Sequence, residues 1–378
     1  MTQDVYLSSG AIENVSAIFD QQNVRSVFVV ADRTAYDLSG AKAKLVPALE
    51  GRECAFFDAF APNPKYDDVM RGLHVWRDHP CDMVLAVGGG SAIDMAKLIG
   101  ICSAHTCESV DLLTGLAPIE HAGPPLIAMP TTAGTGSEDT HFAVVYVDGQ
   151  KYSVAHEFVL PNYAVVDSDL TANLPASITA HTGLDALSQA VESFWSVNAT
   201  PTSQGFASEA LTLVMANLEV AVHNPSPDVR LNMCKAAHLA GKAINISKTT
   251  APHAISYTLT SHFGVPHGLA VALTLGPMLV YNYAVGADDC CHPEGVGPVH
   301  KGLHSLLSLF EVEAAQEAHE RIEALIVAIG CPTRLGDVGV QTNADIDLLV
   351  QNVNTERLQN NPRMLSQDAL RALLNNIR

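Results

Sequence analysis

Apolar runs in the first half of the chain alternate with amphipathic segments of helical length. Short β-branched runs predict buried strands at residues 26–31, 83–87, 125–129 and 163–166. Between the early strands, apolar residues recur every three to four positions, which predicts helices at 41–49 and 66–77. Since parallel neighbours need a crossover connection, this alternation favours a parallel sheet with covering helices.

The pattern changes in the second half of the chain. Residues 142–147 and 152–154 flank Asp148-Gly149, a pair typical of two-residue turns, and predict a hairpin. After about residue 175 the helical period dominates, and it predicts helices that include 203–222, 228–245, 303–310 and 314–329. We therefore expect an α/β domain over residues 1–174 and an all-helical domain over 175–378.

The composition is that of a folded, acidic protein. Apolar residues make up 48% of the 378 residues, which is enough for two packed cores. The net charge of −19 repels phosphate backbones and anionic lipid, so we expect no nucleic-acid or membrane partner. No apolar run reaches the roughly 18 residues of a membrane span, and the first residues do not have the pattern of a secretory signal. We expect a cytoplasmic protein whose eight cysteines are reduced.

Two glycine-containing loops follow predicted strands. The first, Gly88-Gly89-Gly90-Ser91, opens a predicted helix, whose N-terminus favours a pyrophosphate. The second, residues 130–138, offers hydroxyls for phosphate or ribose. The first loop lacks the GxGxxG fingerprint, and each has a structural alternative, namely a strand-to-helix turn or a helix cap by Thr135 or Ser137. Because both loops lie at the carboxyl edge of one sheet, together they predict a nucleotide site.

Asp32 ends the first of the predicted strands. An acid at this place accepts hydrogen bonds from adenosine ribose hydroxyls and repels a 2′-phosphate, which favours NAD over NADP. The adjacent Arg33 weakens this inference, and a simple turn aspartate is the alternative.

Four side chains from two distant segments form a candidate metal site. Asp185 and Gln189 are spaced i, i+4 in a predicted helix, so they project from one face a turn apart. His253 and His267 follow downstream. One carboxylate, one amide oxygen and two imidazoles suit a divalent cation that polarises a substrate oxygen. The segment Cys290-Cys291-His292 is a weaker alternative, because adjacent cysteines do not easily share one tetrahedral ion.

Four motifs resemble, in this order, those of the iron-containing (group III) alcohol dehydrogenases: GGGSAIDMAK, PTTAGTGSE, GLDALSQAVE and HFGVPHG. The resemblance covers essentially the whole chain. It implies a Rossmann-like N-terminal domain, an all-helical C-terminal domain and a homodimer, with NAD and a divalent ion, Fe²⁺ or Zn²⁺, in a cleft between the domains. The implied metal ligands are Asp185, Gln189, His253 and His267. The implied cofactor contacts are Asp32, Asn63, Gly89, Gly90, Ser91, Asp94, Thr131, Thr132 and Lys151, to which we add Thr135 of the second loop.

Two positions depart from the family pattern. The family usually has histidine where this chain has Gln189. Because an amide oxygen is a weaker, harder ligand, we expect weaker metal binding or preference for a harder ion, and loss of the metal is the alternative. The family often has a second histidine near the nicotinamide where this chain has Tyr257, so we expect Tyr257 or a water to replace it in proton relay.

The segment before His253 is suited to an anionic group. It contains Asn245, Lys248, Thr249 and Thr250. A cation among hydroxyls favours an anion, and Arg363 is a further candidate cation. The segment also resembles the phosphonoacetaldehyde-reducing branch of the family. We therefore expect NADH-dependent reduction of phosphonoacetaldehyde to 2-hydroxyethylphosphonate, or of a close anionic aldehyde such as sulfoacetaldehyde.

Three other functions stay open from the sequence. A general short-chain alcohol or diol dehydrogenase fits the same motifs if Lys248 faces solvent. Sugar-phosphate cyclases of the dehydroquinate synthase kind share the sheet, the helical domain and the metal cleft, although this chain lacks the density of Lys, Arg and His expected around a polyhydroxylated phosphate. A metal-free nucleotide-binding sensor is the non-catalytic alternative.

Overall fold

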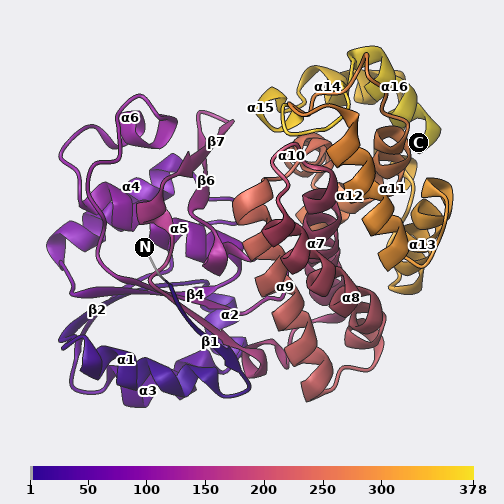
Figure 1. The fold of residues 1–378 in the computed structure, drawn as a ribbon. Coiled ribbons are helices and arrows are strands. Elements are labelled where there is room, and N and C mark those ends of the chain that lie inside the picture. Colours follow the sequence, from indigo (N-terminus) through magenta and orange to yellow (C-terminus); the bar gives the residue numbers. More distant parts are fainter. Residues whose placement is uncertain (1–2) are drawn as a thin grey trace. The chain divides into compact units, whose positions relative to one another are not determined.

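The computed structural model describes residues 3–378, the side chains of residues 355 and 356 excepted. The chain forms two compact units. The first comprises the residues up to Leu174 together with Ser226–Cys234, and the second comprises Pro175–Pro225 and Lys235–Arg378. The first unit contains the main sheet, whereas the second is helical (Figure 1). The expected fold class, a parallel α/β part followed by an all-helical part, is confirmed.

The first unit is built on a six-stranded sheet in which all strands are parallel. Its order is β1 (Asp4–Ser8), β8 (Tyr163–Asp167), β5 (Leu126–Pro130), β4 (Met83–Gly88), β2 (Ser26–Ala31) and β3 (Glu53–Phe57). The four predicted strands are confirmed as β2, β4, β5 and β8. The sequence pattern missed β1 and β3, because both are edge strands whose exposed residues interrupt the apolar run.

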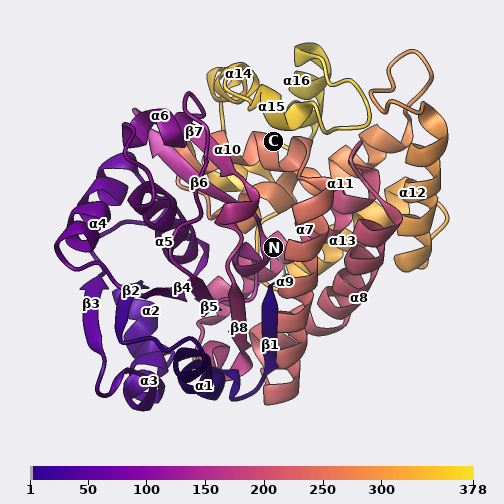
Figure 2. The ribbon, with the colours of Figure 1, turned by 60° about the vertical axis from the view of Figure 1, so that its left-hand side comes forward.

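The sheet is covered by helices on both faces. Phe28 of β2 joins one apolar cluster and its neighbour Val29 joins the other, because successive side chains of a strand point to opposite faces. In Figure 2, α4 and α5 cover one face, and α1 and α3 cover the other. The helices of this unit are α1 (Asn14–Gln21), α2 (Arg33–Leu38), α3 (Ala41–Leu49), α4 (Tyr66–Asp78), α5 (Gly90–Ser103) and α6 (Ser109–Thr114).

An antiparallel hairpin accompanies the sheet. Strands β6 (Phe142–Val147) and β7 (Gln150–Ala155) pair antiparallel, with Asp148-Gly149 at the turn, and β7 is longer than the predicted 152–154. Both turn residues have positive φ, 50° and 78°, as a primed hairpin turn requires. The predicted hairpin is therefore confirmed.

The strand order creates a switch point between β2 and β4. The chain moves outward from β2 to β3 and then returns to β4 on the other side of β2. Open α/β sheets bind ligands outside the carboxyl ends of the strands at such a reversal. Asp32 follows the end of β2, and the glycine loop begins at the end of β4.

Helix α7 (Ala176–Trp195) lies at the centre of the second unit, with most of its residues buried. The other helices are α8 (Pro201–His223), α9 (Pro227–Ser247), α10 (Ala251–Phe263), α11 (His267–Tyr283), α12 (Val296–Leu309), α13 (Ala315–Ala328), α14 (Asn343–Gln351), α15 (Thr355–Leu358) and α16 (Gln367–Asn376). The residues of α9 up to Cys234 belong to the first unit. The predicted helices are confirmed, but α12 begins seven residues earlier than the pattern indicated, at 296 rather than 303. Its first turn contains Gly297 and Pro298, which hide a helix start although proline is tolerated there.

Helix α8 is long and apolar enough to cross a membrane by length and composition alone. In the structure it packs against α7 as a core helix. A Cβ at Gly183 of α7 would lie 2.2 Å from Leu218 Cδ1 of α8, so the missing side chain is what lets the two helices approach. The apolarity of α8 is explained by this contact and by its buried residues, among them Leu211 and Val214.

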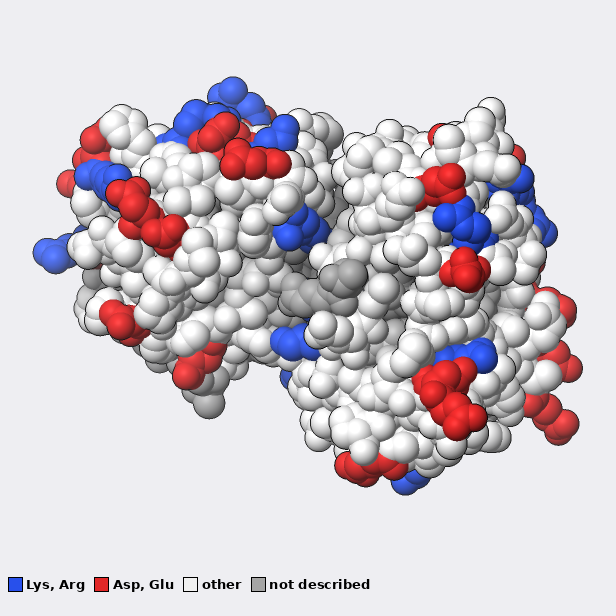
Figure 3. Space-filling view, turned by 90° about the horizontal axis from the view of Figure 1, so that it is seen from above, with Lys and Arg blue, Asp and Glu red and all other residues white. Residues whose placement is uncertain are grey.

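The surface mixes acidic and basic side chains. On the face shown in Figure 3, both kinds are dispersed among a majority of uncharged residues, and the Lys and Arg side chains form no broad basic patch among the residues described there. This distribution agrees with the net charge of −19.

Candidate functional site

Three of the predicted metal ligands converge within the helical unit. Asp185 comes from α7, His253 from the first turn of α10, and His267 from the first residue of α11. Asp185 Oδ1 lies 3.4 Å from His253 Nε2 and 3.9 Å from His267 Nε2. Asp185 and His253 are buried, whereas the His267 side chain is 37% exposed. One side of the group is therefore open to a substrate.

The donor atoms of this group fit a divalent metal. The buried Asp185 Oδ1 accepts no hydrogen bond of normal geometry from the residues that the structure describes. Two ligand atoms at the usual ~2.1 Å from one tetrahedral ion are about 3.4 Å apart, which is the separation of Asp185 Oδ1 and His253 Nε2. The buried carboxylate favours a positive charge beside it, and a divalent metal bound by these three side chains would supply that charge.

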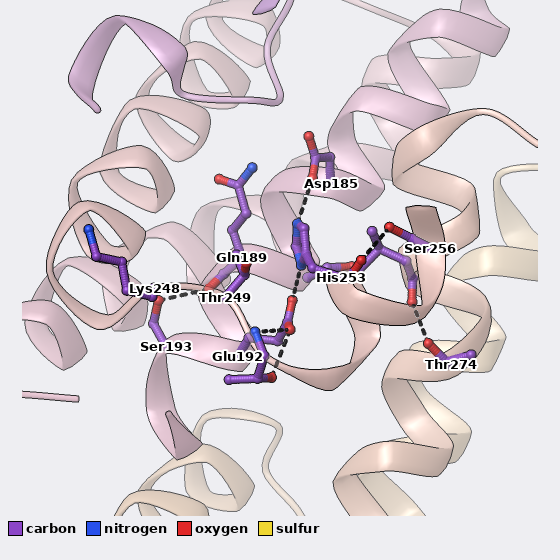
Figure 4. A network of polar contacts seen from close by, with 12 residues as sticks. Asp185, Gln189, Glu192, Ser193, Lys248, Thr249, His253, Ser256 and Thr274 are labelled. Carbon is purple, nitrogen blue, oxygen red and sulfur yellow. Dashed lines mark hydrogen bonds and ion pairs between the residues drawn. The ribbon is translucent and has the colours of Figure 1, made fainter. Parts of the chain in front are cut away.

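Glu192 holds His253 from the opposite side. Figure 4 shows the His253 ring between the carboxylates of Asp185 and Glu192. His253 Nδ1 bonds to Glu192 Oε2, while Glu192 Oε1 accepts from both the backbone N and the hydroxyl of Thr250 at 2.8 Å each. Burial alone lowers the pKa of His253, but the two carboxylates outweigh burial and raise that pKa to about 10. Donation from Nδ1 would leave Nε2 to face a bound metal, which is the usual arrangement of a histidine ligand and its carboxylate partner.

The role of Glu192 was not predicted from the sequence. A usable signal was present, because Asp185, Gln189 and Glu192 are spaced i, i+4, i+7 and share one helix face. Gln189 is 3% exposed. Burial acts to raise the pKa of Asp185, but the neighbouring His253 and His267 lower it, and Gln189 makes a smaller contribution in the same direction. Coordination of the metal by Gln189 stays a prediction.

His267 is positioned by a close approach between two helices. A Cβ on Gly268 would lie 1.9 Å from the backbone oxygen of His181 in α7, so only glycine lets α11 begin this close to α7. Ser256 Oγ lies 3.4 Å from His267 Nδ1. Tyr257, one turn after His253, stacks its half-buried ring on the His267 ring at 6.3 Å between centroids and 16° between planes. Tyr257 thus lies beside the metal ligands, and its part in proton transfer stays a prediction.

The nucleotide loops meet at the switch point of the sheet. Thr131 N donates to Gly88 O at 3.0 Å, which joins the ends of β5 and β4. Gly88 has φ +151°, and a Cβ there would lie 2.7 Å from Ala92 Cβ and 3.2 Å from Asp32 Cβ. The glycine loop and Asp32 are therefore neighbours. Asp32 Oδ1 accepts from Ala35 N at 2.8 Å and so caps α2, in addition to any contact with a ribose.

The other predicted cofactor contacts gather at the head of α5. The backbone N of Asn63 donates to Ser91 Oγ at 3.1 Å. A Cβ at Gly89 would lie 3.5 Å from Thr132 Oγ1, and a Cβ at Gly90 would lie 2.9 Å from Thr135 Oγ1. Lys151 lies opposite Tyr146 in the hairpin, and Tyr146 N donates to Pro64 O beside Asn63. These residues surround a surface of glycine backbone that suits a pyrophosphate.

Two predicted cofactor contacts have buried side chains. Asp94 Oδ1 accepts from Ser137 Oγ at 2.5 Å and Oδ2 accepts from Val144 N at 2.9 Å, so this carboxylate ties α5 to the second loop and to β6. Thr131 is 1% exposed, and its buried hydroxyl oxygen makes no hydrogen bond with the residues that the structure describes. Contact of these two side chains with the cofactor stays a prediction. Lys97, which was not predicted, completes this framework by donating to the carbonyls of residues 137, 140 and 142.

The segment before His253 is only partly as expected. Lys248 is half-buried at the end of α9, with a φ of 63°, and burial, then the charge of Arg357, lowers its pKa to about 8. Asn245 is half-buried one turn earlier, and the Thr249 side chain is 7% exposed. The expectation that Thr250 binds the anion of the substrate is corrected. Its fully buried hydroxyl donates to Glu192 and accepts from Trp195 Nε1 at 2.8 Å, so this side chain supports the candidate metal site instead.

Two further candidates do not reach the site. Arg363 Nε donates to Asp289 at 2.6 Å, its Nη1 donates to Tyr281 O at 2.8 Å, and its guanidinium covers the Tyr281 ring, so Arg363 is a structural residue. Among the described residues, Cys290, Cys291 and His292 do not converge on one point as a metal group does. Soft metal ligation by that segment is therefore not supported.

Comparison with known proteins identifies the family. A model of the iron-containing alcohol dehydrogenases matches residues 2–168, and a model of the C-terminal part of the Fe-containing alcohol dehydrogenase family matches residues 179–377. This chain belongs to the iron-containing alcohol dehydrogenase family. It is therefore an oxidoreductase, a metal-dependent alcohol dehydrogenase or aldehyde reductase linked to NAD(P). The cyclase and the non-catalytic sensor are excluded as alternatives.

Relatives within the family are named for different substrates. Long-chain-alcohol dehydrogenase 1 of Geobacillus thermodenitrificans is 34% identical over 86% of this chain and 82% of its own length. Phosphonoacetaldehyde reductase of Streptomyces viridochromogenes is 36% identical over 78% of this chain and 75% of its own length. The crystal structure of sulfoacetaldehyde reductase from Bifidobacterium kashiwanohense in complex with NAD⁺ has a TM-score of 0.88 and 31% identity, covering 99% of this chain and 96% of that one. Family membership thus leaves the substrate to be argued from the residues of the site.

Proposed function

We propose that this enzyme uses NADH to reduce a small anionic aldehyde, with phosphonoacetaldehyde, which gives 2-hydroxyethylphosphonate, as the best candidate. The observation that supports the substrate class is Lys248. This lysine is half-buried in an acidic protein, on the turn that leads directly into the helix of His253. In Figure 4 its side chain and the Gln189 amide point in the same direction. A cation held at this place suits the terminal anion of a two-carbon aldehyde.

The backbone conformation of Lys248 strengthens the argument. A non-glycine residue in the left-handed region costs roughly 1–3 kcal/mol and persists where its surroundings fix it. Here Ser247 Oγ, fully buried, bonds to Ser193 Oγ at 2.9 Å, and Thr250 N bonds to Glu192 on the other side of the turn. The strain is therefore maintained by the same framework that holds His253. A glycine at this position would avoid the strain, and the presence of lysine instead favours a function for its charge.

The remaining residues would have distinct tasks. Asp185, Gln189, His253 and His267 would hold the metal, which polarises the aldehyde oxygen when bound. The glycine loop, with Asn63, Ser91, Thr132, Thr135 and Lys151, would hold the cofactor phosphates, and Asp32 would select NADH. Tyr257, stacked on His267, is the candidate to deliver the proton to the product alcohol. Lys248, with Asn245 and Thr249, would orient the substrate through its anion.

The test compares two aldehydes in three proteins. We expect Lys248→Met to lower the ratio of kcat/KM for phosphonoacetaldehyde to that for propanal by about 10- to 100-fold, since a hydrogen bond to a charged group contributes about 1.5–3 kcal/mol. Lys301→Met, which removes an exposed lysine from α12, is the matched control and should leave the ratio unchanged. A wild-type ratio near one, or an unchanged ratio in Lys248→Met, would support a general short-chain alcohol or diol dehydrogenase instead.

We also propose a cytoplasmic homodimer, on the family resemblance and on the cysteines, all eight of which are free thiols in the structure. Light scattering should give twice the chain mass of 40.1 kDa. A monomer mass at micromolar concentration would contradict the dimer without affecting the proposed reaction.

A further inference from the structure

A buried tryptophan is hydrogen-bonded, through two other side chains, to a candidate metal ligand. Trp195, one of two tryptophans in the chain, is the last residue of α7 and is 1% exposed. Its indole Nε1 donates to the Thr250 hydroxyl oxygen at 2.8 Å. That hydroxyl donates to Glu192 Oε1 at 2.8 Å, and Glu192 Oε2 bonds to His253 Nδ1. A buried chain of hydrogen bonds therefore runs from Trp195 to His253.

The chemistry of these groups fixes the direction of the chain of hydrogen bonds. An indole N–H donates and never accepts, so the Thr250 oxygen accepts from Trp195. The single hydroxyl proton of Thr250 is then directed to Glu192 Oε1, which also accepts from the Thr250 backbone N at 2.8 Å. Because Oε1 accepts from both donors of Thr250, Oε2 is the oxygen that faces His253 Nδ1. All the protons in the chain thus point toward the carboxylate.

The orientation of the Glu192 carboxylate depends on the two donors of Thr250. The terminal torsion of a glutamate side chain is broad, so the carboxylate rotates easily unless its oxygens are held. A hydroxyl also rotates to suit its neighbours, because it both donates and accepts. A partner that can only donate removes this freedom, since it occupies the oxygen and leaves the proton for the carboxylate. The Trp195 N–H therefore fixes the Thr250 hydroxyl, and the hydroxyl fixes the plane of the carboxylate.

Serine contacts hold the ends of this chain of hydrogen bonds together independently of Trp195. Ser196 Oγ donates to Ser247 O at 2.5 Å, and Ser247 Oγ bonds to Ser193 Oγ at 2.9 Å. Both contacts join the end of α7 to the turn before α10, and they come from the residues on either side of Trp195 and its neighbour. Loss of the indole N–H alone therefore removes an orienting bond and leaves the attachment of the turn in place.

We propose that Trp195 is a positioning residue of the metal site, which acts through the Thr250 hydroxyl on the carboxylate that orients His253. The inference rests on the metal site of the proposed function and is independent of the proposed substrate. Two consequences follow from the direction of the hydrogen bonds. Removal of the indole N–H weakens metal binding, and it does so only where Glu192 is present to transmit the effect.

The test measures the Zn²⁺ affinity of metal-free protein by competition with a chelator. We expect Trp195→Phe, which keeps an aromatic ring but removes the N–H, to bind Zn²⁺ about 3- to 10-fold more weakly, the factor that one hydrogen bond typically contributes. Trp76→Phe is the matched control, because it makes the same change in the first unit, where Trp76 packs edge-on against Phe28. Thr250→Val should weaken binding at least as much as Trp195→Phe, and Thr250→Ser, which keeps the hydroxyl, should recover most of that loss.

A double variant separates positioning from a general effect on folding. In Glu192→Gln protein, Trp195→Phe should weaken Zn²⁺ binding by less than about twofold more, because the residue that transmits its effect is already changed. Wild-type affinity in Trp195→Phe, or the same loss in both backgrounds, would overturn the inference and leave the metal site standing. If Trp195→Phe does not fold, equal affinities of Thr250→Val and Thr250→Ser would overturn it. A wild-type protein that binds no Zn²⁺ would contradict both this inference and the metal site of the proposed function.

Discussion

Replacing Glu192 by glutamine tests how the metal site is held together. The carboxylate is fully buried and makes three hydrogen bonds, with His253 Nδ1, Thr250 N and the Thr250 hydroxyl. A glutamine has one acceptor oxygen and one donor amide in the same space. If its oxygen keeps the two bonds from Thr250, its amide faces His253 Nδ1. That nitrogen must then accept, and the ring proton moves to Nε2, where it blocks the metal.

The alternative orientation is no better. If the glutamine oxygen faces His253, its amide faces the N–H of Thr250, and a buried donor is left without a partner at a cost of about 1–3 kcal/mol. Loss of a carboxylate partner from a ligand histidine typically lowers metal affinity 10- to 100-fold, which corresponds to about 1.4–2.7 kcal/mol. The two estimates agree, so we expect Glu192→Gln to bind Zn²⁺ or Fe²⁺ about 10- to 100-fold more weakly than the wild-type protein.

The assay titrates metal-free protein with Zn²⁺ in competition with a chromogenic chelator. Glu219→Gln, an exposed position on α8, is the matched control and should bind as the wild type does. Circular dichroism of the metal-free proteins checks that the fold is retained. Metal affinity and kcat/KM within twofold of wild type in Glu192→Gln would refute the assignment of this residue as the partner that orients His253.

Three further predictions concern positions where the structure is specific. Gly268→Ala should lower the melting temperature and the metal content, because its Cβ would lie 1.9 Å from the backbone of His181. The control Gly205→Ala should be tolerated, since a Cβ there would have nothing within 4 Å. Equal melting curves for both variants would contradict the close contact at Gly268. Gly89→Ala should keep the wild-type melting temperature, since the nearest atom to the new Cβ is 3.5 Å away. The variant should nevertheless bind NADH more weakly in a fluorescence titration. Unaltered NADH affinity would count against the loop as the pyrophosphate site. The preference for phosphonoacetaldehyde over propanal should fall as the pH rises through about 8, where Lys248 loses its proton. Lys248→Arg should flatten this pH profile, because arginine keeps its charge. Identical pH profiles for the wild type and Lys248→Arg would show that Lys248 does not contribute the charge.

The sequence predicted those parts of the fold that depend on local pattern. The inner strands β2, β4, β5 and β8 are buried on both faces, so their apolar runs are continuous and easily recognised. The edge strand β3 begins with the exposed residues Glu53 and Cys54, and no local signal distinguishes it from a loop. Its place is decided by pairing with β2, which the sequence pattern does not contain.

The site shows the same division between local and distant interactions. Asp185 and Gln189 were predicted from their spacing within one helix, and the structure places Asp185 in the candidate metal group. Glu192 was missed because its function depends on His253, which is 61 positions away. Thr250 was misassigned for a related reason: its residue type suits an anion, but only the fold places its hydroxyl between Glu192 and Trp195.

The central claim is that Asp185, His253 and His267, with Gln189, hold one divalent ion that the reaction requires. The most direct measurement determines metal content by elemental analysis alongside aldehyde turnover, in wild-type protein and in His267→Ala, before and after chelation. The account predicts about one ion per wild-type chain, loss of both ion and turnover on chelation or in His267→Ala, and recovery of wild-type turnover when Fe²⁺ or Zn²⁺ is returned. Full NADH-dependent turnover by chelated protein that contains no metal would contradict it.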